Sequence, residues 1–273
     1  MPSSSVLETI RDNSLFGLQE AVRAIQSREA LEQSGQAYVV AATCHRRLAF
    51  CALLADAKPD RFAAHLCHSA HARLHFRRLV SGDHGAESRF LGATQEFSFI
   101  DALAAGQPDL ATAIAQLAAR GHDPAFEYED DFLLHHFLHQ LLLTVRGAGT
   151  ADLPALLTRW EVVLEGGSDT YLDACRALLH RDARFFDEAL QSTAYARMLH
   201  FQKLSRDSGP NDELKKTEGA LFMNGLAMLR LAELQGMDTQ REYPTLPSLA
   251  RVPTGRPAPP PTAWMSPSPW MSE

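Results

Sequence analysis

Apolar residues recur at helical spacing along most of the chain, and the pattern is clearest between residues 168 and 204. Two sets of apolar positions follow the three-and-four spacing of an amphipathic helix on either side of a break near Arg181: Tyr171, Leu172, Cys175, Leu178 and Leu179 before it, and Phe186, Ala189, Leu190, Met198 and Phe201 after it. A single helix of about a dozen residues is marginal in water. The pattern therefore predicts an antiparallel helix pair that packs against further helices, with Leu178 and Phe186 buried.

The same spacing predicts helices along the rest of the chain, over residues 5–32 (one or two helices), 36–57, 61–80, 87–104, 109–120, 127–146, 152–165 and 211–236. Residues 36–57 are apolar almost all round, as in a buried central helix. No stretch combines an alternating strand pattern with hairpin turn residues. We therefore predict an all-α fold, an irregular bundle of about ten antiparallel helices with solenoid-like helix pairs. A regular solenoid is not indicated, because the helix openings at Asp109 and Asp152 have no third copy at the same interval.

The composition changes near the C-terminal end of the sequence, where proline becomes frequent from Pro253 onwards. Proline lacks a backbone donor, and the segment has almost no periodic apolar pattern. We therefore expect residues 1–250 to form a single helical domain and residues 251–273 to form a Pro-rich flexible tail. Trp264 and Trp270 are expected to be loosely docked or unused.

Charge narrows the range of partners. The net charge is -7 and the pI about 5.9, which argues against nucleic-acid binding because neutralising phosphates needs clustered Lys and Arg. Residues 126–273 carry 14 basic and 20 acidic side chains, so a partner with a basic surface is expected. The sequence has no secretory signal pattern, and no apolar run approaches the roughly 20 residues that cross a bilayer. We therefore expect a cytoplasmic protein that binds neither nucleic acid nor membrane. Its four cysteines lack CxxC spacing and are expected to be reduced core thiols.

Histidines are the one unusual enrichment and suggest a metal site. His68, His71 and His75 share one face of a predicted helix, and His135 and His139 lie one turn apart on another; two such helices face to face would resemble a metal site in a bundle core. The apolar stripe Leu133, Leu134, Phe137 and Leu141 instead predicts that His135, His136 and His139 point outward. HExxH, Glu-x-x-His, P-loop and nucleophile-elbow motifs are all absent. We therefore predict no catalysis, no metal and no cofactor, and keep a metal-dependent hydrolase that uses these histidines as an alternative.

Carboxylates gather where the helix over residues 127–146 begins. Glu127, Glu129, Asp130 and Asp131 fall in its first turn, where the helix dipole favours negative charge. Further acidic residues follow at Glu161, Glu165, Asp169 and Asp173. Such surfaces speed and orient association with a basic protein, although a merely solvated face gives the same pattern. The candidate binding residues are Glu127, Glu129, Asp130, Asp131, Glu165 and Asp169.

Two segments point to a family. The run from Tyr171 to Leu190, followed by a Met-Leu-His helix, and the helix from Glu218 to Met237, followed by Tyr-Pro-Thr-Leu-Pro, resemble the all-helical immunity proteins of bacterial polymorphic toxin systems. Within these the similarity is to the family called immunity protein forty-nine, and it covers about a third of the chain. The resemblance implies a cytoplasmic antidote that binds one cognate toxin and catalyses no reaction. A helical-repeat adaptor that binds several peptides is the alternative.

Overall fold

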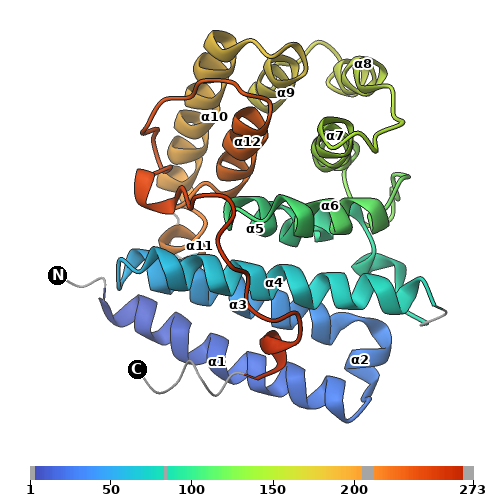
Figure 1. The fold of residues 1–273 in the computed structure, drawn as a ribbon, viewed down its shortest axis with the longest axis vertical. Helices are drawn as coiled ribbons and strands as arrows, with labels where there is room; N and C mark the ends of the chain where they lie inside the picture. Colours follow the sequence, from blue (N-terminus) through green and yellow to red (C-terminus); the bar gives the residue numbers. More distant parts are fainter. Residues whose placement is uncertain (1–3, 83–84, 205–211, 267–273) are drawn as a thin grey trace.

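The computed structural model describes residues 4–82, 85–204 and 212–266, and these residues form an all-α fold. The long helices α1, α3 and α4 lie side by side at one end of the molecule, α5 and α6 lie against them, and α7 to α10 and α12 make up the other end (Figure 1). The described part contains no β-strand, which confirms the predicted fold class. The α-helices are α1 (Ser4–Gln26), α2 (Ala30–Ser34), α3 (Gln36–Leu54), α4 (Pro59–Val80), α5 (Phe97–Ala104), α6 (Pro108–Leu117), α7 (Glu129–Val145), α8 (Leu153–Val163), α9 (Thr170–His180), α10 (Ala183–Leu204), α11 (Asp212–Lys216) and α12 (Met223–Leu234).

Helix α3 is the centre of its end of the molecule, because α1 packs on one side of it and α4 on the other. Most of its side chains are buried, as predicted for a central helix. Within the described residues it is also the one helix long and apolar enough to cross a membrane, with 67% of that stretch buried by the rest of the protein. The expectation that no run approaches that length is therefore wrong for α3, although burial of this kind is typical of a core helix.

The predicted pair between residues 168 and 204 forms α9 and α10. Arg181 separates the two helices in a left-handed conformation with φ 55°, and the Asp182 carboxylate accepts a hydrogen bond of 3.0 Å from the Phe185 amide at the start of α10. Leu178 and Phe186 are fully buried in the main apolar core. The helix pair and its two core residues are therefore confirmed.

Residues 87–96 are not the helix that the sequence predicted. They form two short 3-10 turns, η1 (Ser88–Phe90) and η2 (Ala93–Gln95), and α5 begins only at Phe97. The backbone carbonyls of Phe90 and Leu91 accept hydrogen bonds from the guanidinium groups of Arg73 and Arg77 on α4, at 2.9 and 2.7 Å. In a helix these carbonyls would accept hydrogen bonds from backbone amides four residues later. Arginine side chains serve as the donors instead, so α5 can begin at Phe97 without leaving these carbonyls unpaired.

The predicted helix over residues 211–236 is also divided, into α11 and α12. Gly219 lies in the gap, where an added Cβ would come within 2.7 Å of the Lys215 carbonyl oxygen. The Phe222 amide then donates a hydrogen bond of 3.0 Å to the Thr245 carbonyl, a contact outside any helix. The helix therefore ends at Lys216, and the chain is helical again only from Met223.

Residues 251–266, here called the strap, run from the foot of α12 past α5 and α4 to the end of the molecule formed by α1, α3 and α4 (Figure 1). The carbonyl of Val252 accepts a hydrogen bond from Arg230 on α12, and Gln107 donates one of 2.8 Å to the Arg256 carbonyl. At the far end, Trp264 in η4 (Ala263–Met265) is fully buried in a second core that α1, α3 and α4 supply. The prediction of a loosely docked tail is wrong for the strap, because one large aromatic side chain anchors it. Trp270 lies outside the described residues.

Candidate functional site

The three histidines that share one face of α4 are partly or fully buried. His68 is fully buried and its ring centroid lies 5.0 Å from that of His45 on α3 and 6.2 Å from that of His65. His71 is partly buried, and the ring centroid of His75 lies 5.8 Å from that of Trp264. Helix α4 is covered by α3, α5, α6 and the strap together, so more than one of its faces is buried.

His45 connects this histidine cluster to the strap. Its Nε2 lies 3.2 Å from the Trp264 carbonyl oxygen, and its Nδ1 lies 3.3 Å from Nδ1 of His65. A carbonyl only accepts, so His45 carries its proton on Nε2 and its Nδ1 accepts from His65. Burial lowers the pKa of His45, His65 and His68 to about 3 each. The cluster is therefore neutral near pH 7 and serves to pack the core and hold the strap.

Two of the three histidines of α7, His136 and His139, are buried and His135 is partly buried, so the prediction that they point outward is wrong. His139 is 1% exposed and stands edge-on to Phe99 of α5, with 4.3 Å between ring centroids. His136 stacks on Phe132 at 5.2 Å, and burial lowers the pKa of His135 to about 4. Helix α7 contacts α6, α8, α9, α12 and η2, which leaves little of its surface for solvent.

The two predicted histidine groups do not come together as metal ligands. In the described ranges, no group of three or more His, Cys, Asp or Glu side chains has the arrangement of a metal site. His68 lies beside His45 and His65, whereas His139 lies beside Phe99. The four cysteines are buried without a disulfide, and burial raises the pKa of Cys67 to about 12, so that thiol is protonated near pH 7 and a poor nucleophile.

A buried charge network, which no sequence pattern predicts, lies between α4 and the start of α5. Arg73 and Arg77 both bind the Glu96 carboxylate, Arg73 at 2.8 Å, and burial of Glu96 is outweighed by these two guanidiniums, so its pKa is lowered. Next to it, Ser69 donates a hydrogen bond of 2.6 Å to Asp101, whose pKa burial raises to about 6. Because Arg73, Glu96 and Asp101 are fully buried, the network fixes the turns η1 and η2 on α4 and offers nothing to a substrate from solution.

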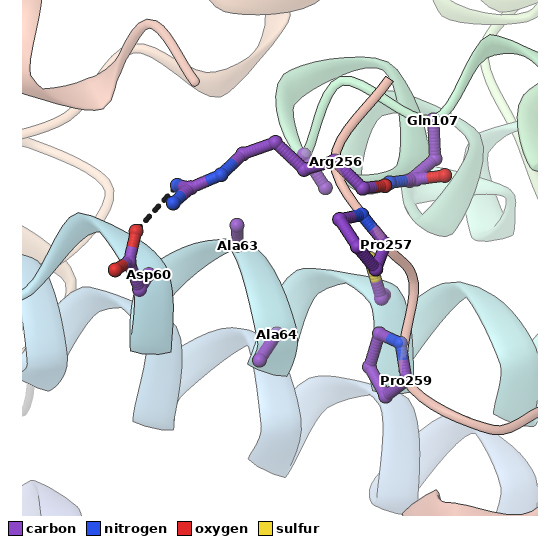
Figure 2. Close-up of a pocket in the computed structure, with 9 residues that line it drawn as sticks. Asp60, Ala63, Ala64, Gln107, Arg256, Pro257 and Pro259 are labelled. Atoms are coloured by element: carbon purple, nitrogen blue, oxygen red, sulfur yellow. Dashed lines mark hydrogen bonds and ion pairs between the residues drawn. The ribbon is translucent and has the colours of Figure 1, made fainter. Parts of the chain in front are cut away.

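A hollow of about 260 Å³ lies beneath the strap. Figure 2 shows Arg256 reaching toward Asp60 on α4, with which it forms an ion pair, while Pro257 and Pro259 stand opposite the small side chains of α4. The floor consists of Ala63, Ala64, Cys67 and Ala105. The prolines bridge the hollow because the strap is held on one side of it at Val252 and Arg256 and on the other side at Trp264.

The six predicted binding residues fall into different roles. Glu127 accepts hydrogen bonds from the amide and hydroxyl of Thr94, at 3.0 and 3.1 Å, and so holds η2 to the start of α7. Glu129 forms an ion pair of 2.6 Å with Arg159 on α8. These two carboxylates are therefore already engaged within the chain, and reversing the charge of Glu127 would remove its contact to Thr94.

Asp130, Asp131 and Asp169 are brought together where α7 and α9 begin. Burial raises the pKa of Asp131, and the charges of Asp130 and Asp169 raise it further. Burial raises that of Asp169 too, against its capping hydrogen bond of 2.8 Å from the Tyr171 amide. In the part of the chain that the structure describes, none of the three forms an ion pair with a basic side chain. Glu165 is exposed, at a left-handed position with φ 49°, and does not join them.

Two exposed aromatic side chains, which were not among the predicted binding residues, lie on the loop that leads into α7. Tyr128 is 80% exposed and Phe126 is 51% exposed, and together with Pro124, Ala125 and Glu127 they line an open hollow of about 300 Å³. Neighbouring exposed aromatic side chains beside charged residues are a common feature of protein-binding surfaces. The available signal was that both rings lie outside the apolar stripe of α7, next to the turn at Asp123 and Pro124.

No family model, curated protein or solved structure matches this chain.

Proposed function

We propose that this protein acts by binding a basic protein partner, through a surface made by Asp130, Asp131 and Asp169 together with the aromatic rings of Phe126 and Tyr128. The observation that carries the proposal is a cluster of three carboxylates, none of which forms an ion pair within the described residues, at the end of a loop with two exposed rings. The mutual repulsion of these carboxylates is relieved when a cationic surface approaches them.

The shifted titratable groups of the interior support binding over catalysis. His45, His68, His139 and Asp101 are nearly or fully enclosed, where a substrate would have to displace the core to reach them. The acidic surface, by contrast, faces solvent. Such a surface speeds the encounter with an oppositely charged protein and orients it, which suits a protein whose task is capture.

The partner we propose is a cognate bacterial toxin, which the protein would neutralise in the cytoplasm. This rests on the resemblance of residues 171–190 and 218–237 to immunity proteins of polymorphic toxin systems and on the negative charge of the proposed surface. A toxin that acts on nucleic acid or on another anionic substrate carries a basic surface, which the carboxylates would occupy.

The test compares Asp130→Lys/Asp131→Lys with Glu8→Lys/Asp238→Lys, which makes the same charge change at exposed positions elsewhere. The probe is a toxin domain encoded beside this gene, with binding rates measured at about 50 and 200 mM salt. We expect the first variant to associate at least ten-fold more slowly, with a weaker salt dependence, and to protect cells poorly, while the control behaves as wild type. Equal rates and equal protection in both variants would rule out this surface.

A further inference from the structure

The aromatic pair Phe126 and Tyr128 stands on a loop that is already fixed in place. The amides of Phe126 and Glu127 donate to the Asp123 carbonyl at 3.1 and 3.2 Å, and the Asp123 carboxylate accepts from the Ala125 amide at 3.1 Å. The His122 ring nitrogen Nε2 lies 2.9 Å from the Glu127 carbonyl oxygen and donates to it. Few conformations remain to be lost when a partner binds this loop, so its two rings are preorganised.

The rings of Phe126 and Tyr128 are exposed, at 51% and 80%. In the described part of the chain neither ring stacks on another aromatic ring, although Phe132, four residues beyond Tyr128, stacks on a histidine. The rings border the open hollow of about 300 Å³. A flat apolar group or a planar cation of side-chain size can enter such a space and contact both rings.

The negative charge around the hollow favours a planar cation over a flat apolar group as its occupant. Glu127 lines the hollow together with the two rings, and Tyr128 immediately precedes α7, whose first turn carries Asp130 and Asp131. The charge of Glu127 also raises the pKa of Asp131, which shows that the loop and the acidic turn share one negative field. A neutral apolar group would gain nothing from that field, whereas a cation over the ring faces gains from both the rings and the carboxylates.

On the basis of the proposed function, we propose that the hollow bordered by Phe126 and Tyr128 is an anchor site for an arginine side chain of the protein partner. The planar guanidinium stacks on an aromatic ring while its edge donates hydrogen bonds to carboxylate oxygens, and a lysine ammonium cannot do both in this geometry. The aromatic rings hold the side chain, and Asp130 with Asp131 compensates its charge.

The probe is the peptide hexa-arginine amide, compared with hexa-lysine amide, in fluorescence anisotropy at about 20 mM salt, where exposed charges are weakly screened. We expect wild-type protein to bind the arginine peptide more tightly than the lysine peptide. Tyr128→Leu keeps an apolar side chain but removes the ring face, and should weaken arginine binding roughly two- to five-fold while lysine binding stays nearly constant. Tyr195→Leu on α10, a similarly exposed tyrosine at 53%, should change neither.

Equal binding of the two peptides by wild type, or equal arginine binding by wild type and Tyr128→Leu, would overturn the anchor site. A titration followed by the ring proton signals of Tyr128 and Phe126 gives a second readout, since an occupied hollow shifts both. The toxin domain tests the proposed function separately. If that domain binds wild type and Tyr128→Leu equally well, the acidic surface binds the toxin without the arginine anchor. If the domain binds neither protein while the arginine peptide still binds, the proposed class of partner is wrong.

Discussion

Replacing Trp264 by Ala measures how much the strap contributes to the fold. The indole is fully buried between α1, α3 and α4, with its ring centroid 6.3 Å from that of Tyr38 and 5.8 Å from that of His75. A buried Trp removes about 200 Å² from water, which at about 25 cal/mol per Å² amounts to about 5 kcal/mol. The indole N–H has no acceptor among the described residues, which offsets about 1–2 kcal/mol. We expect Trp264→Ala to lower the free energy of unfolding by about 3–4 kcal/mol, within the usual range for such truncations.

The assay is equilibrium urea unfolding at pH 7.5, followed by circular dichroism at 222 nm, with the slope and midpoint fitted separately. Pro260→Ala is the control, because Pro260 belongs to the same strap but is exposed. A chain ending at Val252 should lose at least as much stability as Trp264→Ala, since it lacks the Arg256–Asp60 ion pair as well. A loss below about 0.5 kcal/mol in Trp264→Ala would refute the reasoning and return the strap to the flexible tail that its composition suggests.

Two further outcomes follow from the interior. Leu178→Ala and Phe186→Ala, at the contact of α9 with α10, should each lower the free energy of unfolding by about 2–5 kcal/mol. Leu214→Ala, at an exposed position, is the control and should change it little. Unchanged urea midpoints in the first two variants would show that the α9–α10 pair is not part of the core. Stability should also fall on acidification, because His45, His65 and His68 have folded pKa values near 3 against 6.5 when unfolded: the unfolded chain binds more protons between these values, so stability present above pH 6.5 is lost as the pH falls toward 3. Asp101, with its pKa raised to about 6, has the opposite effect and adds stability as the pH falls from 6 to 4. Removing one of the histidines in His45→Asn should make the urea midpoint fall less steeply between pH 7.5 and 5. An unchanged dependence of the midpoint on pH would contradict the role of the histidine cluster.

Local apolar spacing was sufficient to predict the elements whose partners are their neighbours in sequence. The pair α9–α10 and the buried residues Leu178 and Phe186 are examples, because one stripe on each helix faces the other. The same reasoning failed where side chains from distant segments take over the backbone. Arg73 and Arg77 bind the carbonyls of residues 90 and 91, and nothing in the periodicity of residues 87–104 signals their presence.

The helical wheel misplaced the histidines for a related reason. It assigns one buried face to each helix, whereas α4 and α7 are surrounded on several sides, so His68 and His139 are as buried as the leucines opposite them. For the proposed binding surface, the sequence pointed to the carboxylates, but it did not separate Glu127 and Glu129, which have partners within the chain, from Asp130 and Asp131. The pairing of Glu129 with Arg159 depends on how α7 and α8 pack, which composition does not specify.

The contact between His45 and Trp264 joins residues 219 positions apart, and it imposes an order on how the protein matures. A ribosome adds about 5–20 residues per second, so roughly 10–40 s pass between the synthesis of α3 and that of the tryptophan that completes its core. During this interval α1, α3 and α4 exist with an unfilled apolar slot lined by Tyr38 and Phe76. The newborn chain is therefore exposed to aggregation and to chaperones at its first three long helices until the strap arrives to seal them.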